Sequence, residues 1–408
     1  MAYLSPGVYV EEVPSAVKPI AGVSTSVAGF VGVVPDSLSI PVSDSQAPGD
    51  PAATPPVPKG VKINTFTVAP AKAPVLVTTW SEFVKSFGDF STDAGQRLLA
   101  QAVFGFFNNG GTRAYVMRFA ALGDLQAPTS LDPFDAIDEI SLIAAPGVSD
   151  ATVQSNLVSN CTKPGIQNRF AILDSAETVT GALTLSNIHP PPDSDYAAFY
   201  FPWIQVFDPP SKLMGSPDGL VYVAPSGHMA GIYARVDTQR GVHKAPANEV
   251  VLGALDLKYG VSRSLQDGLN PKGVNCIRNL NGNIRVWGAR TIGGDDNTDF
   301  KYINVRRLFL FLRASIDGGT QWVVFEPNDA TLWAKITRNV TAFLTNVWRS
   351  GALFGATPQQ AFYVKCDQET NPPEVRDLGQ VVTEIGVAVV KPAEFVVFRI
   401  SQWAGPGQ

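Results

Sequence analysis

The apolar positions alternate between short β-rich runs and stretches with helical spacing. Residues 21–34 carry a valine-rich run that predicts a first core strand. Thr79 and Glu82 form a capping box that predicts a short helix ending near Gly88. Further strands are predicted at 75–78, 115–117, 140–144, 169–173, 199–207 and 220–224, and further helices at 93–107, 133–139 and 150–160. This alternation predicts an α/β layer structure.

The last third of the chain has a different pattern. Residues 300–316 are apolar almost all round, which predicts a buried helix that Gly318 and Gly319 end. A second long helix is predicted over 330–349, with Asn328 or Asp329 as its cap. Strands are predicted at 284–287, 322–325, 362–365 and 386–390. The fold class is therefore α/β to α+β, with several domains.

A proline-rich stretch interrupts the first half. Residues 36–74 hold eight prolines and a single aromatic side chain, Phe66. Such a stretch can bury little apolar surface, which predicts an exposed loop or excursion. The expected organisation is an N-terminal arm at 1–20, an α/β domain at 21–280 with this excursion, a C-terminal domain at 281–391 and a C-terminal arm at 392–408.

Both ends carry apolar, β-prone segments, although chain ends are usually polar. Prolines flank each segment, and the apolar side chains are Val8, Tyr9, Val10 and Val13 at the front and Phe395, Val396, Val397, Phe398 and Ile400 at the back. Each segment can add a strand to its own domain or to a neighbouring subunit. The pattern alone leaves both alternatives open.

Composition excludes several classes of protein. The net charge of −5 and the pI of about 5.3 argue against a phosphate-backbone binder, so we expect no nucleic-acid partner. The three cysteines, Cys161, Cys276 and Cys366, are far apart and predict neither a disulfide framework nor a zinc site. The first residues lack the features of a secretion signal, and no run reaches the ~18 apolar residues of a membrane span. We therefore expect a protein made in a cytoplasm, with no direct membrane insertion.

The candidate chemistry is sparse. An α/β hydrolase-like enzyme would use His243 as a general base oriented by Asp237, but no nucleophile elbow precedes them near His228. A polar patch between domains or subunits explains these residues better. Residues 294–299 resemble a calcium loop, but Phe300 and Arg306 stand where the glycine and the glutamate should be. We expect no catalytic residue, cofactor or metal. Arg306 and Arg307 predict a satisfied contact within a domain or, as the weaker alternative, an anchor between subunits.

An ordered series of segments resembles the contractile phage tail sheath family over nearly the whole chain. The series includes SPGVYVEEV at 5–13, YAAFYFPWI at 196–204, APSGHMAGIYARVDTQRGVHKAPANE at 224–249, IRVWGARTI at 284–292 and PAEFVVFRI at 392–400. Residues 36–74 match nothing common to the family. The resemblance covers both halves of a sheath subunit in one chain, whereas type VI secretion sheaths divide them between two. It therefore implies a phage tail or a phage-derived injection particle.

The resemblance also implies partners and a mechanism. Subunits would polymerise as stacked sixfold rings around an inner tube, cross-linked by their terminal arms, and would contract to drive the tube through a target envelope. Baseplate and cap or terminator proteins would be further partners, and assembly would occur in the bacterial cytoplasm. A non-contractile tail or baseplate component is the remaining alternative.

One helix carries a candidate contact to that tube. The face of 330–349 opposite its apolar side holds Lys335, Arg338 and Arg349 and no acidic residue. The ordinary interpretation is a solvated face with an arginine near the helix C-terminus. Since the resemblance places a helix of this region against the tube, these residues are tube-facing candidates.

Overall fold

The computed structural model describes residues 19–399, which form two compact units. Within the described residues, the sheet unit comprises residues 23–311 and 390–399, and the small unit comprises residues 19–22 and 312–389. The division falls inside the helix α9 (Ile303–Thr320), later in the chain than the boundary near 280 expected from the sequence.

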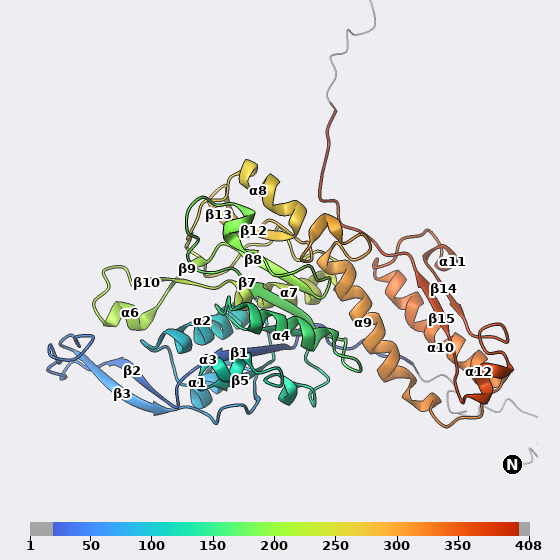
Figure 1. Ribbon diagram of the computed structural model, residues 1–408, viewed down its shortest axis with the longest axis horizontal. Helices are drawn as coiled ribbons and strands as arrows, with labels where there is room; N and C mark the ends of the chain where they lie inside the picture. Colours follow the sequence, from blue (N-terminus) through green and yellow to red (C-terminus); the bar gives the residue numbers. More distant parts are fainter. Residues whose placement is uncertain (1–18, 400–408) are drawn as a thin grey trace, which may run out of the picture. The chain divides into compact units, whose positions relative to one another are not determined.

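The sheet unit is built on eight strands in the order β13-β12-β8-β7-β6-β1-β5-β4 (Figure 1). The six central strands are parallel, and β13 and β4 pair antiparallel at the two edges. The bounds are β1 (Ala28–Val33), β4 (Val75–Val77), β5 (Ala114–Phe119), β6 (Leu142–Ala144), β7 (Phe170–Asp174), β8 (Ala197–Phe201), β12 (Val274–Leu280) and β13 (Asn283–Val286). This sheet confirms the α/β prediction.

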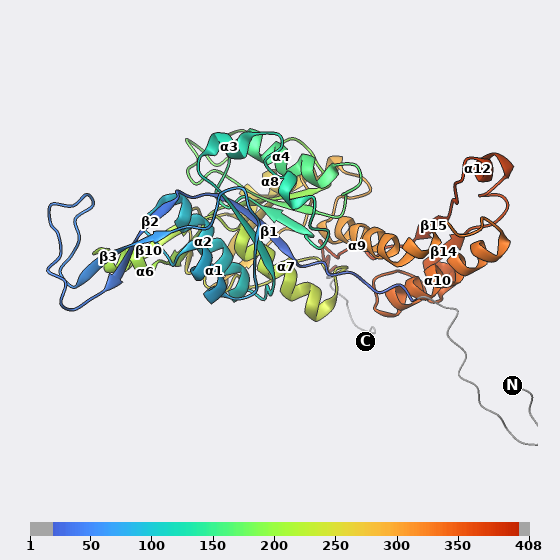
Figure 2. The same cartoon turned by 90° about the horizontal axis from the view of Figure 1, so that it is seen from below.

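Helices cover both faces of the sheet, as a parallel sheet with two apolar faces requires. In Figure 2, α3, α4 and α8 lie on one side of β1, and α1 and α7 lie on the other. Phe30 belongs to the core on the α2 and α7 side, whereas its neighbour Val31 belongs to the opposite core. The helices are α1 (Trp80–Phe87), α2 (Ala94–Asn108), α3 (Leu122–Gln126), α4 (Ala151–Thr162), α5 (Leu185–Ile188), α7 (Ser226–Arg240) and α8 (Arg263–Leu269).

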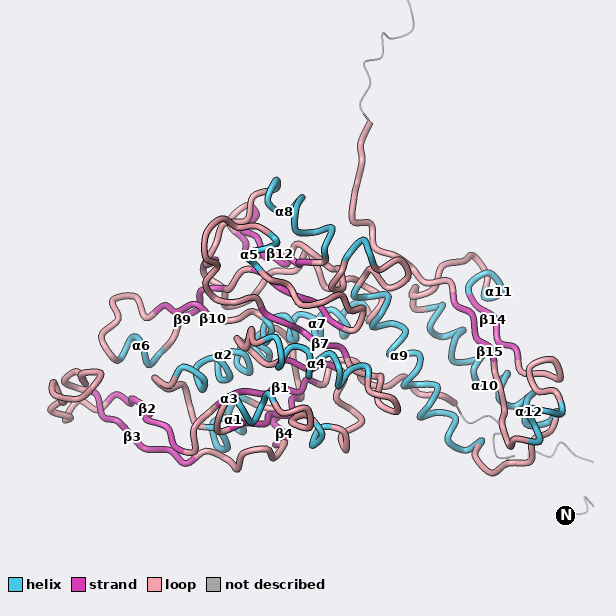
Figure 3. Tube along the Cα trace, in the orientation of Figure 1, coloured by secondary structure: helices cyan, strands magenta, loops and turns pink. Residues whose placement is uncertain are grey.

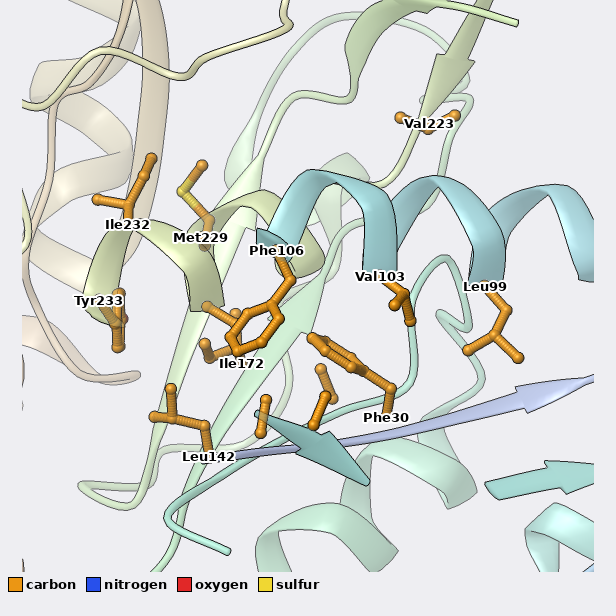
Figure 4. Packing of buried hydrophobic residues seen from close by; sticks show 14 of the residues in the cluster. Phe30, Leu99, Val103, Phe106, Leu142, Ile172, Val223, Met229, Ile232 and Tyr233 are labelled. Atoms are coloured by element: carbon orange, nitrogen blue, oxygen red, sulfur yellow. The ribbon is translucent and has the colours of Figure 1, made fainter. Parts of the chain in front are cut away.

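The helices α2 and α7 cross at very short range above the sheet. A Cβ added to Gly231 would lie 2.4 Å from the Phe106 carbonyl oxygen, and one added to Gly227 would lie 2.3 Å from that of Ala102. Phe106 and Val103 point down from α2 onto Phe30, beside Met229 and Tyr233 of α7 (Figure 4). The sequence did not predict α7, because its side chains are buried almost all round and give no amphipathic period.

Smaller elements complete the sheet unit. The strands β9 (Ile204–Phe207), β10 (Leu220–Val223) and β11 (Asp256–Leu257) form a second sheet, with α6 (Pro209–Leu213) beside it. The strand predicted over 199–207 is in fact β8 and β9, separated at Pro202, which cannot donate to a ladder. The helix predicted at 133–139 is a single 3₁₀ turn, η1 (Asp132–Phe134).

The stretch 36–74, expected as an exposed loop or excursion, contains regular structure. Residues 37–67 contain an antiparallel hairpin of β2 (Ser37–Ser43) and β3 (Val61–Thr67). Leu38, Ile40 and Val68 are buried against the core that contains Phe83 and Phe87 of α1. Composition did not predict the hairpin, because a few apolar residues suffice to hold it in place when a neighbouring helix supplies most of the buried surface.

The small unit contains α10 (Ala330–Arg349), α11 (Pro358–Ala361), α12 (Pro373–Asp377), and a two-stranded sheet of β14 (Phe362–Lys365) and β15 (Glu384–Val387). Asp329 caps α10, since its carboxylate accepts from the Leu332 N–H at 2.8 Å. The strand predicted at 322–325 is wrong, because a 3₁₀ turn, η4 (Gln321–Val323), begins there. Gly318 and Gly319 lie inside α9 and do not end it.

A buried carboxylate holds the start of α7. Asp174, at the end of β7, accepts hydrogen bonds from the Ser226 N–H at 2.9 Å, the Ser226 hydroxyl at 2.6 Å and the Gly147 N–H at 3.1 Å. Burial nevertheless raises the pKa of Asp174 to about 6. Asp174 therefore joins the end of β7 to the loop at Gly147 and to the start of α7, through a carboxylate that is costly to ionise.

None of the helices between residues 19 and 399 has the length and apolar character needed to cross a membrane.

The α2–α7 crossing predicts that Gly231→Ala destabilises the protein. The new methyl group must displace the backbone of α2, so we expect a loss of about 1–3 kcal/mol in the free energy of unfolding. Urea unfolding followed by circular dichroism measures it. The matched control is Gly268→Ala in α8, where a Cβ meets nothing within 4 Å. This control should be neutral or slightly stabilising, and equal effects of the two variants would contradict the close crossing.

Asp174 predicts a pH dependence. Its pKa in the folded state, about 6, lies above the ordinary value of 3.8, so the folded state binds the proton more tightly. The stability contributed by Asp174 therefore falls as pH rises from about 4 to 6. Relative to the parent, Asp174→Asn should be more favourable at pH 7 than at pH 4, by on the order of 2 kcal/mol. Urea unfolding at both values tests this, and a difference independent of pH would refute it.

Candidate functional site

The C-terminal segment presents an uncovered row of apolar side chains. Phe395, Val396, Val397 and Phe398 are 68–84% exposed, and residues 391–399 run as an extended stretch outside any strand (Figure 3). Ile400 and the N-terminal candidates Val8, Tyr9, Val10 and Val13 lie outside the described residues. Burying such a row elsewhere is favourable by roughly 25 cal/mol for each Å² covered.

Glu394, immediately before this row, is a functional candidate that the sequence interpretation missed. Its carboxylate accepts two hydrogen bonds from the Arg290 guanidinium, at 2.8 and 2.9 Å. It also accepts from the Asn270 amide at 2.7 Å and the Tyr302 hydroxyl at 2.9 Å. A carboxylate inside an otherwise apolar segment was the signal that could have identified it. The exposed row therefore leaves the sheet unit from a fixed point.

The small unit offers an incomplete sheet. Among residues 19–399, the strands β14 and β15 pair only with each other, and the single bridge of Leu353 with Val389 lies beyond the end of β15. A two-stranded sheet is marginally stable alone, and this one packs on α10. Within residues 19–399 no further strand pairs with its outer edges, and such an edge is a usual acceptor of an added strand.

The predicted positive stripe lies on the outer side of α10. Arg338 and Arg349 are exposed and Lys335 is partly buried, while Leu332, Ile336, Val340 and Leu344 are buried on the opposite side. None of the three cations forms an ion pair with a residue in the described range. Within the described part of the chain, their charge is therefore not neutralised by an ion pair.

The arrangement around His243 does not support hydrolase chemistry. Asp237 is 6% exposed and pairs with Arg307, which donates to its two oxygens at 2.9 and 2.5 Å. Among the described residues, no hydrogen bond joins Asp237 to His243. Burial, and then the charge of Arg240, lowers the pKa of His243. Asp237 thus neutralises the buried Arg307 and does not orient His243 as a general base.

His228 has a packing role. Its ring lies 2.3 Å from the position that a Cβ on Gly105 would occupy, in the contact between α2 and α7. Burial lowers its pKa to about 4, so the ring is neutral at pH 7. A polar pocket of about 470 Å³ lies beside Asp174, Gln154 and His189, but neither His228 nor His243 lines it.

Two of the acidic side chains in the loop at 294–299 form ion pairs with nearby basic residues. Asp295 contacts Arg290 at 3.1 Å and Lys301 at 2.5 Å, and Asp296 contacts Lys272 at 2.6 Å. Within residues 19–399, no three His, Cys, Asp or Glu side chains gather as a metal site. The loop therefore has the charge balance of a structural turn.

The chain matches known proteins in both sequence and fold. Residues 125–292 match the phage tail sheath protein central domain, and residues 295–402 match the phage tail sheath C-terminal domain. A tail sheath protein of Vibrio phage KVP40 is 28% identical over 181 residues, which are 44% of this chain and 26% of that protein. The chain thus spans about a quarter of that relative's length.

Solved structures match almost end to end. The sheath complex of the extracellular contractile injection system PVC, in its contracted state, has a TM-score of 0.74 and 27% identity, covering 99% of each chain. A chain of the sixfold-symmetrised baseplate of the anti-feeding prophage has a TM-score of 0.72 and 27% identity, covering 98% of this chain and 99% of that one. Since the two domain matches follow one another along the sequence and the fold agrees, the chain belongs to the phage tail sheath protein family.

Proposed function

We propose that this chain is the structural subunit of a contractile sheath, which polymerises around an inner tube and contracts to drive it through a target envelope. The observation that carries this proposal is the end-to-end match to the PVC sheath subunit in its contracted state. The particle is a phage tail or a phage-tail-like injection system, assembled in the bacterial cytoplasm. The role is mechanical, without catalysis, cofactor or direct contact with nucleic acid or membrane.

The terminal segments link the subunits. Residues 1–20 and 392–408 act as arms, and each crosses to a neighbouring copy to complete a sheet. The exposed row at Phe395–Phe398 supports this, because it is β-prone and uncovered. The β14–β15 sheet also supports it, since the edges of this sheet can accept a strand from a neighbouring copy. A patch that meets a different patch on the next copy builds an open polymer rather than a closed dimer.

The remaining partners follow from family membership. Rings are sixfold, as in the baseplate of the anti-feeding prophage, and meet baseplate and cap or terminator proteins at the ends. Residues 281–391 form a tube-proximal domain. Lys335, Arg338 and Arg349 face an acidic tube wall, with each exposed pair worth about 1 kcal/mol or less. Many weak contacts can guide assembly and still release during contraction.

The direct test of the sheath function is assembly of the purified protein. Negative-stain microscopy at low and high salt should show hollow, striated cylinders. A protein that remains monomeric under all conditions, including with its tube protein, would contradict the proposal.

The exposed row predicts a separation between folding and assembly. Val397→Asp with Phe398→Asp should leave the melting temperature within about 2 °C, because both side chains are exposed in the single chain. The same change should abolish cylinders, because charges buried in a shared sheet lack partners. Val397→Thr with Phe398→Tyr, which keeps β propensity, is the control and should assemble. Loss of cooperative melting in the aspartate variant would show that the row belongs to its own domain.

The positive stripe predicts a selective loss of tube binding. Lys335→Glu with Arg338→Glu should abolish wrapping of the tube yet leave polymerisation into tube-free cylinders, since the arms are intact. Lys59→Glu with Lys62→Glu, on exposed positions of the β2–β3 hairpin, makes the same change in net charge and should still wrap tubes. Co-sedimentation with tube protein at low salt measures this. Equal wrapping by both variants would show that the stripe is only a solvated face.

A further inference from the structure

We propose that the start of α9, residues 302–307, connects the roots of both terminal segments, together with two ion pairs whose arginines are buried, Arg290–Glu394 and Arg307–Asp237. The roots are Glu394 for the C-terminal segment and Thr25 for the N-terminal segment. This inference deepens the proposed function and rests on it, because the segments can carry load only if they engage neighbouring copies. Every residue involved lies within the sheet unit.

The C-terminal root is held at Glu394 by residues from three places in the chain. Arg290 is 3% exposed, and its guanidinium meets the Glu394 carboxylate with two parallel hydrogen bonds, the geometry that fixes orientation most strongly. Burial raises the pKa of Glu394, but the hydrogen bonds and charge of Arg290 outweigh it and hold the pKa below its usual value. The contact is therefore ionised, and intact, throughout the neutral range.

The N-terminal root is held at Thr25 by the second pair. The Thr25 hydroxyl donates to Asp237 at 2.6 Å, and the Arg307 guanidinium donates to the Thr25 carbonyl oxygen at 2.8 Å. Arg307 is 3% exposed, pairs with both oxygens of Asp237 and lies over the Tyr233 ring at 4.8 Å. The grip on the backbone carbonyl fixes the chain just before it enters β1.

One short piece of backbone carries both grips. Tyr302, whose hydroxyl donates to Glu394, immediately precedes α9, and Arg307 lies in its second turn. Arg290 is tied to the same piece, since Arg290 and Tyr302 form a β-bridge and the Ile303 N–H donates to the Ala289 carbonyl at 3.0 Å. A force on one segment is thus transmitted to the other through hydrogen-bonded backbone and two charge pairs, which together form a rigid connection.

A purely structural role makes a different prediction. Buried ion pairs that only support the fold change its stability when they are broken. If the pairs hold the roots, breaking a pair makes its root more mobile, and the more mobile root then weakens the assembly. If load passes from one root through α9 to the other, breaking either pair interrupts the same path.

The first measurement is root mobility in the unassembled full chain. The three native cysteines are buried, so a spin label can be placed selectively on Ala393→Cys or Ser24→Cys, both exposed positions. Glu394→Gln should mobilise the label at 393, and Asp237→Asn the label at 24. Asp195→Asn is the matched control, because Asp195 pairs with Arg306, the neighbouring arginine on α9, and contacts neither root. It should mobilise neither label.

The second measurement is the critical concentration for cylinder assembly. Losing a charged hydrogen-bonded pair at one root should raise it about tenfold, with Asp195→Asn unchanged. The variant Glu394→Gln with Asp237→Asn should also raise it about tenfold, since the path is already broken. A hundredfold rise would mean that the roots act independently and would overturn the coupling. If Asp237→Asn does not fold, Thr25→Val, which removes one hydroxyl, takes its place with a smaller effect.

The outcomes separate this inference from the proposed function. Rigid labels at both roots in the variants would overturn the double grip even if the sheath assembles as proposed. Conversely, normal assembly after deletion of residues 1–13 and 395–408 would refute the linking role of the segments, whatever the labels report.

Discussion

A sheet of six parallel strands has two apolar faces, and each face must be covered by helices to keep it from water. This requirement organises the sheet unit. On one face the cover depends on α7, which approaches α2 at Gly227 and Gly231 so closely that a methyl group would collide with backbone. Asp174 fixes the start of α7, and Asp237 near its end meets Arg307. The helix that closes the core therefore also supplies the acidic partner for α9 and the N-terminal root.

Buried charge has a directional role in this protein. The side chains of Arg290 and Arg307 are almost completely removed from water. The free-energy cost of this desolvation is offset only by close partners that form several hydrogen bonds. Apolar contacts could stabilise the same places, but they would allow sliding, whereas a bidentate pair fixes position and angle. In the proposed sheath, a fixed exit point would make each linking segment move together with the sheet unit that bears it.

Local signals in the sequence identified much of the regular structure. The capping box at Thr79, the cap at Asp329 and the apolar spacing of 330–349 are interactions within a few residues, so they survive in any tertiary context. Predictions failed where a distant neighbour decides. The hairpin in 37–67 depends on α1 for its cover, and α7 has no period because it is buried on all sides. The strand predicted at 322–325 had β-prone composition but lies in a turn.

By itself, the sequence determined that the chain alternates strands and helices, that its C-terminal end carries an apolar β-prone row, and that a positive stripe follows one helix. Each of these is a property of residue order and spacing. Only the tertiary structure decided that Asp237 belongs to Arg307 rather than to His243, and that Glu394 belongs to Arg290. Those partners lie 70 and 104 positions apart, and the energy of a charge pair depends on burial and geometry, which spacing along a chain does not encode.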